Sequence, residues 1–167
     1  MSDTHATNTA GLWSIYFPSK TPEQVLDEAH ARHEEWSVLY KAQQDVMASH
    51  RDCETDEDEE DEADYWQRLA TAMTAIHRHA GVPDKWINDR GHDVVPAGIC
   101  RGCWQPGATD IDRCGGCEYH YHPACYLARD IRGDLRLAAA ARIRGDEGRA
   151  IEMERAALAK HGRRERQ

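Results

Sequence analysis

The feature that most constrains this chain is a group of five cysteines and one histidine within 26 residues. The pattern is Cys-x2-Cys, a ten-residue gap, a second Cys-x2-Cys, four residues and His-x2-Cys, formed by Cys100, Cys103, Cys114, Cys117, His122 and Cys125. Thiolates and imidazoles are the usual ligands of zinc, and a Cys-x2-Cys pair turns the backbone so that both sulfurs face one ion. Gly102, Gly115 and Gly116 lie inside the two pairs, where a tight turn leaves little room for a Cβ. The pattern predicts structural Zn²⁺, with one or two ions.

Two pairings of these ligands are open. In the first, Cys100 and Cys103 share an ion with His122 and Cys125, and the middle Cys-x2-Cys pair lies on a hairpin between them. Pro123 is typical of the first position of a helix, so this pairing gives a knuckle, a hairpin and a helix that carries the last ligands, which is a treble-clef arrangement. In the second, the four cysteines of the two Cys-x2-Cys pairs form a zinc ribbon by themselves. We favour the first pairing.

The string Cys-x2-Cys-x4-His-x2-Cys from Cys114 to Cys125, with the aromatic Tyr121 before the histidine, resembles the core of a PHD finger, the cross-brace zinc module of many chromatin readers. The resemblance covers about 26 of 167 residues. It implies that the ligands of the first pairing hold one ion and the middle Cys-x2-Cys pair a second. The family's last Cys-x2-Cys pair does not follow Cys125, so its peptide-reading function is not carried over. A complete second site would need other ligands, such as His92 or His120.

A catalytic role for the cluster is not favoured. Catalytic zinc keeps one coordination position for water, whereas five or six protein ligands in so short a stretch favour closed sites. A dithiol role for Cys114 and Cys117 lacks the βαβ context of redox motifs. Cys53 stands alone beside an acidic run and is interpreted as an unpaired thiol. The sequence therefore predicts that the protein is not an enzyme.

Charge is unevenly distributed along the chain. Residues 1–98 carry 8 basic and 20 acidic side chains, a net charge of −12, whereas residues 99–167 carry 13 basic and 10 acidic ones. Nine of the eleven residues from Glu54 to Asp64 are carboxylates, and such a run repels itself and stays solvated. Acidic surfaces favour basic partners, so we expect a protein partner of that kind. Nucleic acid is the alternative partner, although residues 127–167 have a net charge of only +4.

Helical patterns occupy most of the remaining chain. Thr21 and Gln24 form a capping box with Pro22 at the first helical position, and we expect a helix to about His50 with one apolar face, marked by Val25, Ala29, Trp36, Leu39 and Val46. A second helix has apolar residues at steps of three and four, and these are Trp66, Leu69, Met73, Ile76 and Ala80. Gly81 ends it. An antiparallel hairpin of these two helices is the simplest arrangement.

The predicted fold is mainly α, with an antiparallel helical hairpin, a small treble-clef zinc module and C-terminal helices. The sequence predicts five segments. Residues 1–20 are an N-terminal segment, residues 21–83 the helical hairpin and residues 84–98 a linker. Residues 99–126 form the zinc module, and residues 127–167 form the C-terminal helices with a basic tail. No run of 18 apolar residues and no secretory signal are present, so we expect no membrane partner and place the cysteines in the reducing cytoplasm. The predicted function is that of a zinc-binding intracellular adaptor or regulatory protein acting through protein–protein interaction. The alternative is a zinc-dependent nucleic-acid-binding regulator.

Overall fold

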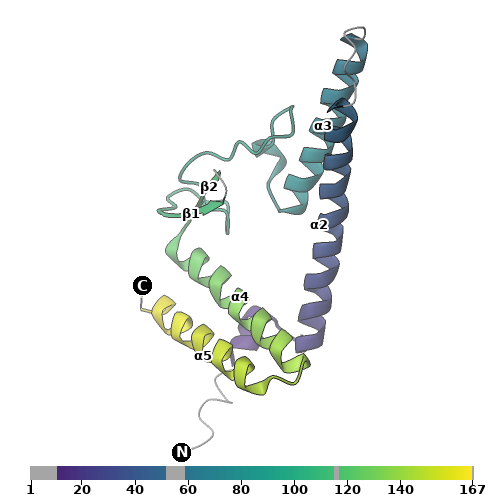
Figure 1. Ribbon diagram of the computed structural model, residues 1–167. Helices are drawn as coiled ribbons and strands as arrows, with labels where there is room; N and C mark the ends of the chain where they lie inside the picture. The colour runs from purple at the N-terminus through teal and green to yellow at the C-terminus, as the bar shows by residue number, and fades with distance from the viewer. Residues whose placement is uncertain (1–10, 52–58, 115–116, 167) are drawn as a thin grey trace, which may run out of the picture. The chain divides into compact units, whose positions relative to one another are not determined.

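The computed structural model describes residues 11–51, 59–114 and 117–166, without the side chains of residues 50–51, 59–61, 113–114 and 117. The chain is mainly helical, as predicted (Figure 1). Its elements in chain order are a short helix over residues 11–16, α2 (Pro22–Arg51), α3 (Glu59–His79), the 3₁₀ helix η1 (Asp84–Trp86), β1 (Asp110–Cys114), β2 (Cys117–Tyr121), α4 (Pro123–Ile143) and α5 (Glu147–Arg164). In the described part of the chain, no helix is long and apolar enough to cross a membrane.

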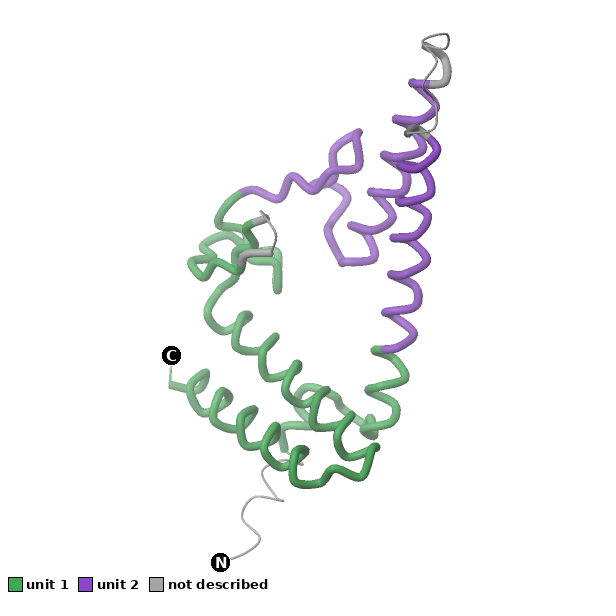
Figure 2. Tube along the Cα trace, in the orientation of Figure 1, with its two compact units in different colours: residues 1–29, 97–167 green, residues 30–96 purple. Residues whose placement is uncertain are grey.

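The chain divides into two compact units, one of residues 1–29 and 97–167 and the other of residues 30–96 (Figure 2). The boundary between them falls inside α2, after Ala29. The five segments predicted from the sequence stay predictions.

Helices α4 and α5 form an antiparallel pair in the unit of residues 1–29 and 97–167 (Figure 1). Three residues form the turn that connects α4 to α5. Arg144 caps the end of α4, Gly145 adopts a φ of +79° that a residue with a Cβ rarely takes, and Asp146 accepts a hydrogen bond from the backbone N–H of Arg149 at 3.1 Å. Many of the buried positions on the two helices are fully buried alanines, whose small side chains allow close helix packing, and these are Ala138, Ala139, Ala141, Ala150 and Ala157.

The aromatic stretch near the N-terminus packs into the core of the same unit. Leu12 is 2% exposed, and it joins Tyr16, Phe17 and Val25 in one cluster with residues of α4 and α5, namely Ile131, Leu135 and Ala157. The hydroxyl of Tyr16 accepts a hydrogen bond from Arg164 at 2.6 Å. The sequence predicts only an N-terminal segment over residues 1–20, whereas the structure makes residues 11–16 helical and part of this core.

In the unit of residues 30–96, the later part of α2 and α3 form the antiparallel hairpin that the sequence predicts (Figure 2). Arg32 donates a hydrogen bond to the carbonyl of His79 at 3.2 Å, and the ring of His79 lies 3.2 Å from the carboxylate of Glu35. Gly81, with a φ of +86°, ends α3 because the N–H of Val82 reaches back to the carbonyl of His77 at 3.0 Å.

The apolar face predicted along the first helix is confirmed except at one residue. Val25 is buried and Ala29, Leu39 and Val46 are half-buried, whereas Trp36 is 39% exposed. A helix of 30 residues is about 45 Å long, so Val25 near its start packs in the core of one unit while its later part belongs to the unit of residues 30–96. The rings of His33, Trp36 and Tyr40 stack on one another along the exposed part.

Candidate metal centre

The first two cysteines of the cluster lie on a tight backbone turn. The N–H of Trp104 donates to the carbonyl of Cys100 at 2.8 Å, which closes the turn from Cys100 to Cys103. Gly102 lies inside this turn, and a Cβ built there would come within 2.8 Å of the Cβ of Cys125. The sequence-based reason for a glycine at this position is thereby confirmed. Trp104 follows the turn with a φ of +60°, a conformation that is rare for a residue with a side chain.

The β1–β2 hairpin brings the last two ligands to this turn. The two strands pair from Asp110 opposite Tyr121 to Cys114 opposite Cys117. His122 follows β2 directly in an extended conformation and is the N-cap residue of α4, with Pro123 in the first turn. Cys125 lies in that first turn, so one strand end and one helix start position His122 and Cys125 together. A knuckle, a hairpin and a helix therefore follow one another as the treble-clef prediction requires.

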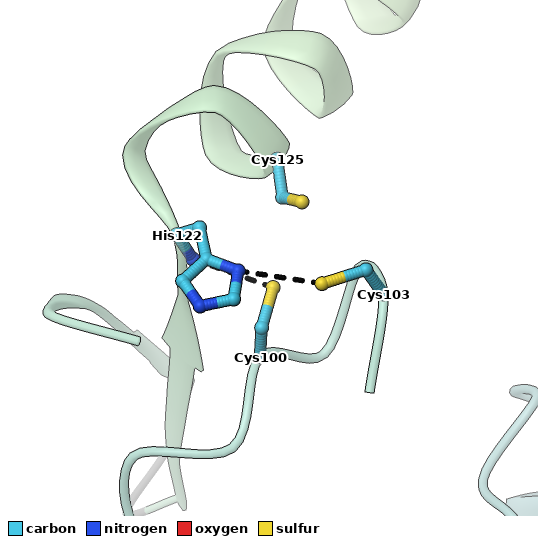
Figure 3. A group of neighbouring side chains, drawn as sticks. All are labelled: Cys100, Cys103, His122 and Cys125. Atoms are coloured by element: carbon cyan, nitrogen blue, oxygen red, sulfur yellow. Dashed lines mark hydrogen bonds between the residues drawn. The ribbon is translucent and has the colours of Figure 1, made fainter. Parts of the chain in front are cut away.

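The structure brings together Cys100, Cys103, His122 and Cys125, which are the four ligands of the first pairing (Figure 3). Their sulfur and nitrogen ligand atoms all lie within 4.8 Å of one another. The edges of a tetrahedron around zinc are about 3.3–3.8 Å for bonds of 2.0–2.3 Å, so small side-chain movements complete the coordination. Cys100 is fully buried. These four residues could hold one metal ion.

The two ring nitrogens of His122 have different partners. Nδ1 lies 3.3 Å from the sulfur of Cys103, and Nε2 lies 2.9 Å from the carbonyl oxygen of Pro106. A carbonyl only accepts hydrogen bonds, so Nε2 carries the proton and Nδ1 offers its lone pair to the cluster. Such a second partner fixes the tautomer and orientation of a ligating histidine. Pro106 is itself held by a β-bridge to Ile99.

Backbone N–H groups favour a thiolate at Cys100. Its sulfur accepts hydrogen bonds from the N–H groups of Gly102 and His122, both at 3.3 Å. Burial acts to raise the pKa of Cys100, but these N–H groups and that of Cys103 together lower it to about 7. The pKa of Cys125 is raised to about 12, first by burial and then by its hydrogen bonds to the sulfurs of Cys100 and Cys103. A thiolate therefore forms readily at Cys100, whereas a second thiolate at Cys125 is disfavoured. A divalent cation bound between the sulfurs would favour the second thiolate as well.

An ion pair ties the first helical turns of α4 to the hairpin beside the cluster. The guanidinium of Arg129 pairs with the carboxylate of Asp112 on β1, and it also lies over the rings of Tyr121 and Tyr126 at 5.4 and 6.0 Å. The hydrogen bond to Asp112, more than any other contact, raises the pKa of Arg129. These contacts help to fix the orientation of α4, which carries Cys125.

The remaining predicted ligands are not tested by this geometry. The backbones of Cys114 and Cys117 face each other at the hairpin end, but their side chains lie outside the described residues, so metal binding by this pair stays a prediction. Gly115, Gly116 and Cys53 also lie outside the described residues. Neither His120 nor His92, the candidates for completing a second site, belongs to the described cluster.

Sequence reasoning missed the carbonyl of Pro106 and the backbone N–H donors of Gly102 and His122. A backbone donor or acceptor leaves no residue-type signal, because every residue except proline offers the same pair of groups. The ion pair of Arg129 with Asp112 was missed too. Its two residues are 17 positions apart on elements whose pairing no local pattern predicts.

No protein-family model matches this chain, and neither the curated proteins nor the solved structures yield a match. The resemblance to PHD fingers therefore rests on the ligand pattern alone.

Proposed function

We propose that Cys100, Cys103, His122 and Cys125 bind a structural Zn²⁺ and that the protein acts as an adaptor or regulator through protein–protein contacts. The observation that carries the zinc assignment is the convergence of three sulfurs and one imidazole nitrogen within 4.8 Å. Soft thiolates with one imidazole select zinc over harder cations such as Mg²⁺ and Ca²⁺. Four protein ligands also fill the zinc tetrahedron, which is the arrangement of structural rather than catalytic sites.

The bound ion would join the knuckle to the start of α4. His122 caps this helix and Cys125 lies in its first turn, and the same helix contributes Ile131 and Leu135 to the core of its unit. Metal-binding free energy would then be folding free energy for the knuckle, the hairpin and the helix start. The zinc would hold a shape and would not react with a substrate, and we accordingly propose that the protein is not an enzyme.

The finer resemblance to PHD fingers is part of this proposal. It predicts a second ion at Cys114 and Cys117, which would need ligands from other residues. The ligand order supports a treble-clef module, and the absent Cys-x2-Cys pair after Cys125 argues against peptide reading of the chromatin type. The thiolate ligands fit a reducing compartment, so we place the protein in the cytoplasm.

The adaptor assignment is supported by the distribution of charged and exposed side chains. Residues 30–96 carry 7 basic and 16 acidic side chains, a net charge of −9, whereas the other unit has 14 of each. Large apolar side chains remain exposed in the acidic unit, among them Trp36, Tyr40 and Trp66. Exposed aromatic side chains on a unit with a strong net negative charge are typical of a protein-binding surface.

The alternative, a nucleic-acid-binding regulator, has less support from the C-terminal helices. Arg142 pairs with Glu147 and Glu154, and Lys160 pairs with Asp134 at 2.9 Å. Cations that are neutralised within the protein release fewer counterions from a phosphate backbone. Tight, steeply salt-dependent binding of the purified protein to mixed-sequence duplex DNA, with no protein partner, would favour this alternative.

Metal content tests the zinc assignment directly. Protein purified without chelator should contain one zinc per chain by elemental analysis, or two if Cys114 and Cys117 complete a second site. Cys103→Ser should remove about one equivalent, and Cys53→Ser, which changes a cysteine outside the cluster, should remove none. Fewer than about half an equivalent in the parent protein would contradict the assignment, because structural zinc is tightly bound.

The pairing of ligands is tested by comparing His122→Ala with Cys100→Ala. Both residues serve one ion in the first pairing, so both variants should lower the melting temperature and the zinc affinity to a similar degree. In a four-cysteine ribbon His122 is not a ligand. Parent-like melting and zinc retention in His122→Ala would therefore establish the ribbon and contradict the first pairing.

A further inference from the structure

A groove lies beside α3 in the unit of residues 30–96. One wall is α3 and the other is the turn formed by residues 88–92, and the space between them measures about 690 Å³. We call it the α3 groove, and its lining consists of Ala63, Trp66, Gln67, Leu69, Ala70, Met73, Asp89, Arg90 and His92. Six of these nine residues are exposed, so the groove is an open trough and not an enclosed cavity.

The turn that forms one wall is rigidly built. The side-chain oxygen of Asn88 accepts hydrogen bonds from the N–H groups of Arg90 and His92, at 3.0 and 2.9 Å. The backbones of Asn88 and His92 are also joined at 3.0 Å, and Ile87 and Asp93 form a β-bridge at the base of the turn. This wall is therefore held in place before any partner arrives.

Gly91, at the tip of this turn, lies directly against α3. It has a φ of +75°, and a Cβ built there would lie 2.3 Å from the carbonyl oxygen of Ala70 and 2.9 Å from the Cβ of Met73. Only a glycine permits this approach. The contact fixes the width of the groove, and a preformed groove binds with a smaller entropic cost than one that must be ordered.

The apolar residues on the helical wall have the spacing of a helix-binding surface. Trp66, Leu69 and Met73 follow one another at steps of three and four, over a length of about 10 Å, or two helical turns. Trp66 is 54% exposed. Grooves that bind an amphipathic helix accept apolar side chains at positions i, i+3 or i+4, and i+7 of the partner, and this spacing gives matching contacts for two or three of them.

Charge selects among the classes of occupant. The unit that holds the groove carries a net charge of −9, so two copies of it repel each other, and a second copy of this chain is disfavoured. A small molecule is disfavoured because its pocket normally buries 70–90% of its surface, and most residues of this trough are exposed. A cationic peptide gains attraction over the whole acidic unit.

We propose that the α3 groove binds a basic amphipathic helix of a partner protein. The apolar face of that helix contacts Trp66, Leu69 and Met73, and its lysines and arginines are attracted by the net negative charge of the unit. This inference rests on the proposed adaptor function and names the chemistry of the partner. The Asn88–His92 turn acts as the fixed wall against which the partner helix packs.

The test uses the full-length, zinc-containing protein and a fluorescein-labelled 14-residue peptide of lysine and leucine, with leucines at i, i+3, i+4 and i+7. Trp66→Ala and Ala63→Arg change exposed groove positions on a helix surface, so both should fold. Each should raise the dissociation constant measured by fluorescence anisotropy about tenfold. The matched controls Val38→Ala and Ala42→Arg change exposed residues of α2 and should stay within about twofold of the parent protein. Binding of the parent should weaken as salt rises.

Three results from the purified protein would overturn the assignment. The first is equal binding of the parent and both groove variants, and the second is equal binding of a scrambled peptide of the same composition, which would show charge attraction alone. The third is a parent dimer in sedimentation that Ala63→Arg converts to a monomer, which would make a second copy the occupant.

A pull-down separates this inference from the adaptor proposal. If the full-length parent and Ala63→Arg capture the same protein partner equally, the groove assignment fails and the adaptor function stands. If the parent captures no protein, the adaptor proposal itself fails, whereas the peptide titration still decides whether the groove binds a basic helix.

Discussion

Replacing Gly102 with alanine should weaken zinc binding, because the knuckle has no space for a methyl group. The added Cβ would lie 2.8 Å from the Cβ of Cys125 and 3.3 Å from its sulfur, whereas nonbonded carbon atoms settle at about 3.5–4.0 Å. The neighbouring atom belongs to a ligand, so it cannot move away without moving its sulfur. The knuckle and the start of α4 must therefore separate by several tenths of an ångström, more than the tolerance of about 0.2 Å in metal–ligand distances.

The magnitude follows from the cost of overpacking a tight site, about 1–3 kcal/mol. If the metal-free knuckle relaxes, most of this cost appears in the binding equilibrium. Since about 1.4 kcal/mol changes an equilibrium constant tenfold, the zinc dissociation constant should rise about 5- to 150-fold. The hydrogen bond from the backbone N–H of residue 102 to the sulfur of Cys100 is available to alanine as well, so the methyl group is the single change.

The assay is a competition titration against a chromophoric zinc chelator. Gly133→Ala is the matched control, because Gly133 lies in the middle of α4 and a Cβ there meets no atom within 4 Å. That variant should bind zinc like the parent and gain up to about 1 kcal/mol of helix stability. Parent-like zinc affinity in Gly102→Ala would refute the close contact between the knuckle and Cys125, and with it the assigned ligand set.

Two further predictions concern the helical core. Leu12→Ala should lower the free energy of unfolding, measured by urea denaturation, by about 2–5 kcal/mol, because Leu12 is 2% exposed. Its control, Ile15→Ala, changes a residue that is 56% exposed and should change this free energy by less than about 0.5 kcal/mol. Equal effects of the two changes would contradict the packing of this helix into the core. Glu154→Gln should lower the free energy of unfolding by about 1–2 kcal/mol, since it removes the buried charge that lies 2.5 Å from Arg142. The control Glu152→Gln changes an exposed residue and should leave this free energy unchanged. An unchanged free energy of unfolding in Glu154→Gln would show that the ion pair contributes nothing to stability.

Local signals in the sequence predicted the helix ends well. Thr21 and Gln24 exchange the two hydrogen bonds of a capping box, at 2.8 and 3.3 Å, as their spacing predicts. Asp146, which follows Gly145, is the N-cap residue of α5, because its side chain accepts a hydrogen bond from the backbone N–H of Arg149. Each of these features depends on residues within one turn of each other, so their physics is contained in a short stretch of sequence. The ligand grouping was predictable because chelation restricts the spacing of cysteines and histidine.

Contacts between distant segments were not predictable from one sequence. Nothing in residues 11–17 indicates that Leu12 and Tyr16 pack against helices more than 100 positions away. The α3 groove was missed because Gly91 signals a turn but does not identify the surface against which that turn packs. The sequence predicts Trp66 and Met73 on the apolar face of a helix, a spacing that suits any apolar neighbour, and the structure places both in the lining of the groove.

The packing of the N-terminal helix against the last helix has a consequence for how the protein is made. Tyr16 and Arg164, which share a hydrogen bond, are 148 positions apart. At about 5–20 residues per second, a ribosome needs roughly 7–30 s to synthesise the chain between them. The first aromatic residues therefore leave the ribosome well before their binding site exists. Cys100 and Cys125, by contrast, emerge within a few seconds of each other, so the knuckle and the start of α4 could bind a metal ion before α5 is available to the N-terminal residues.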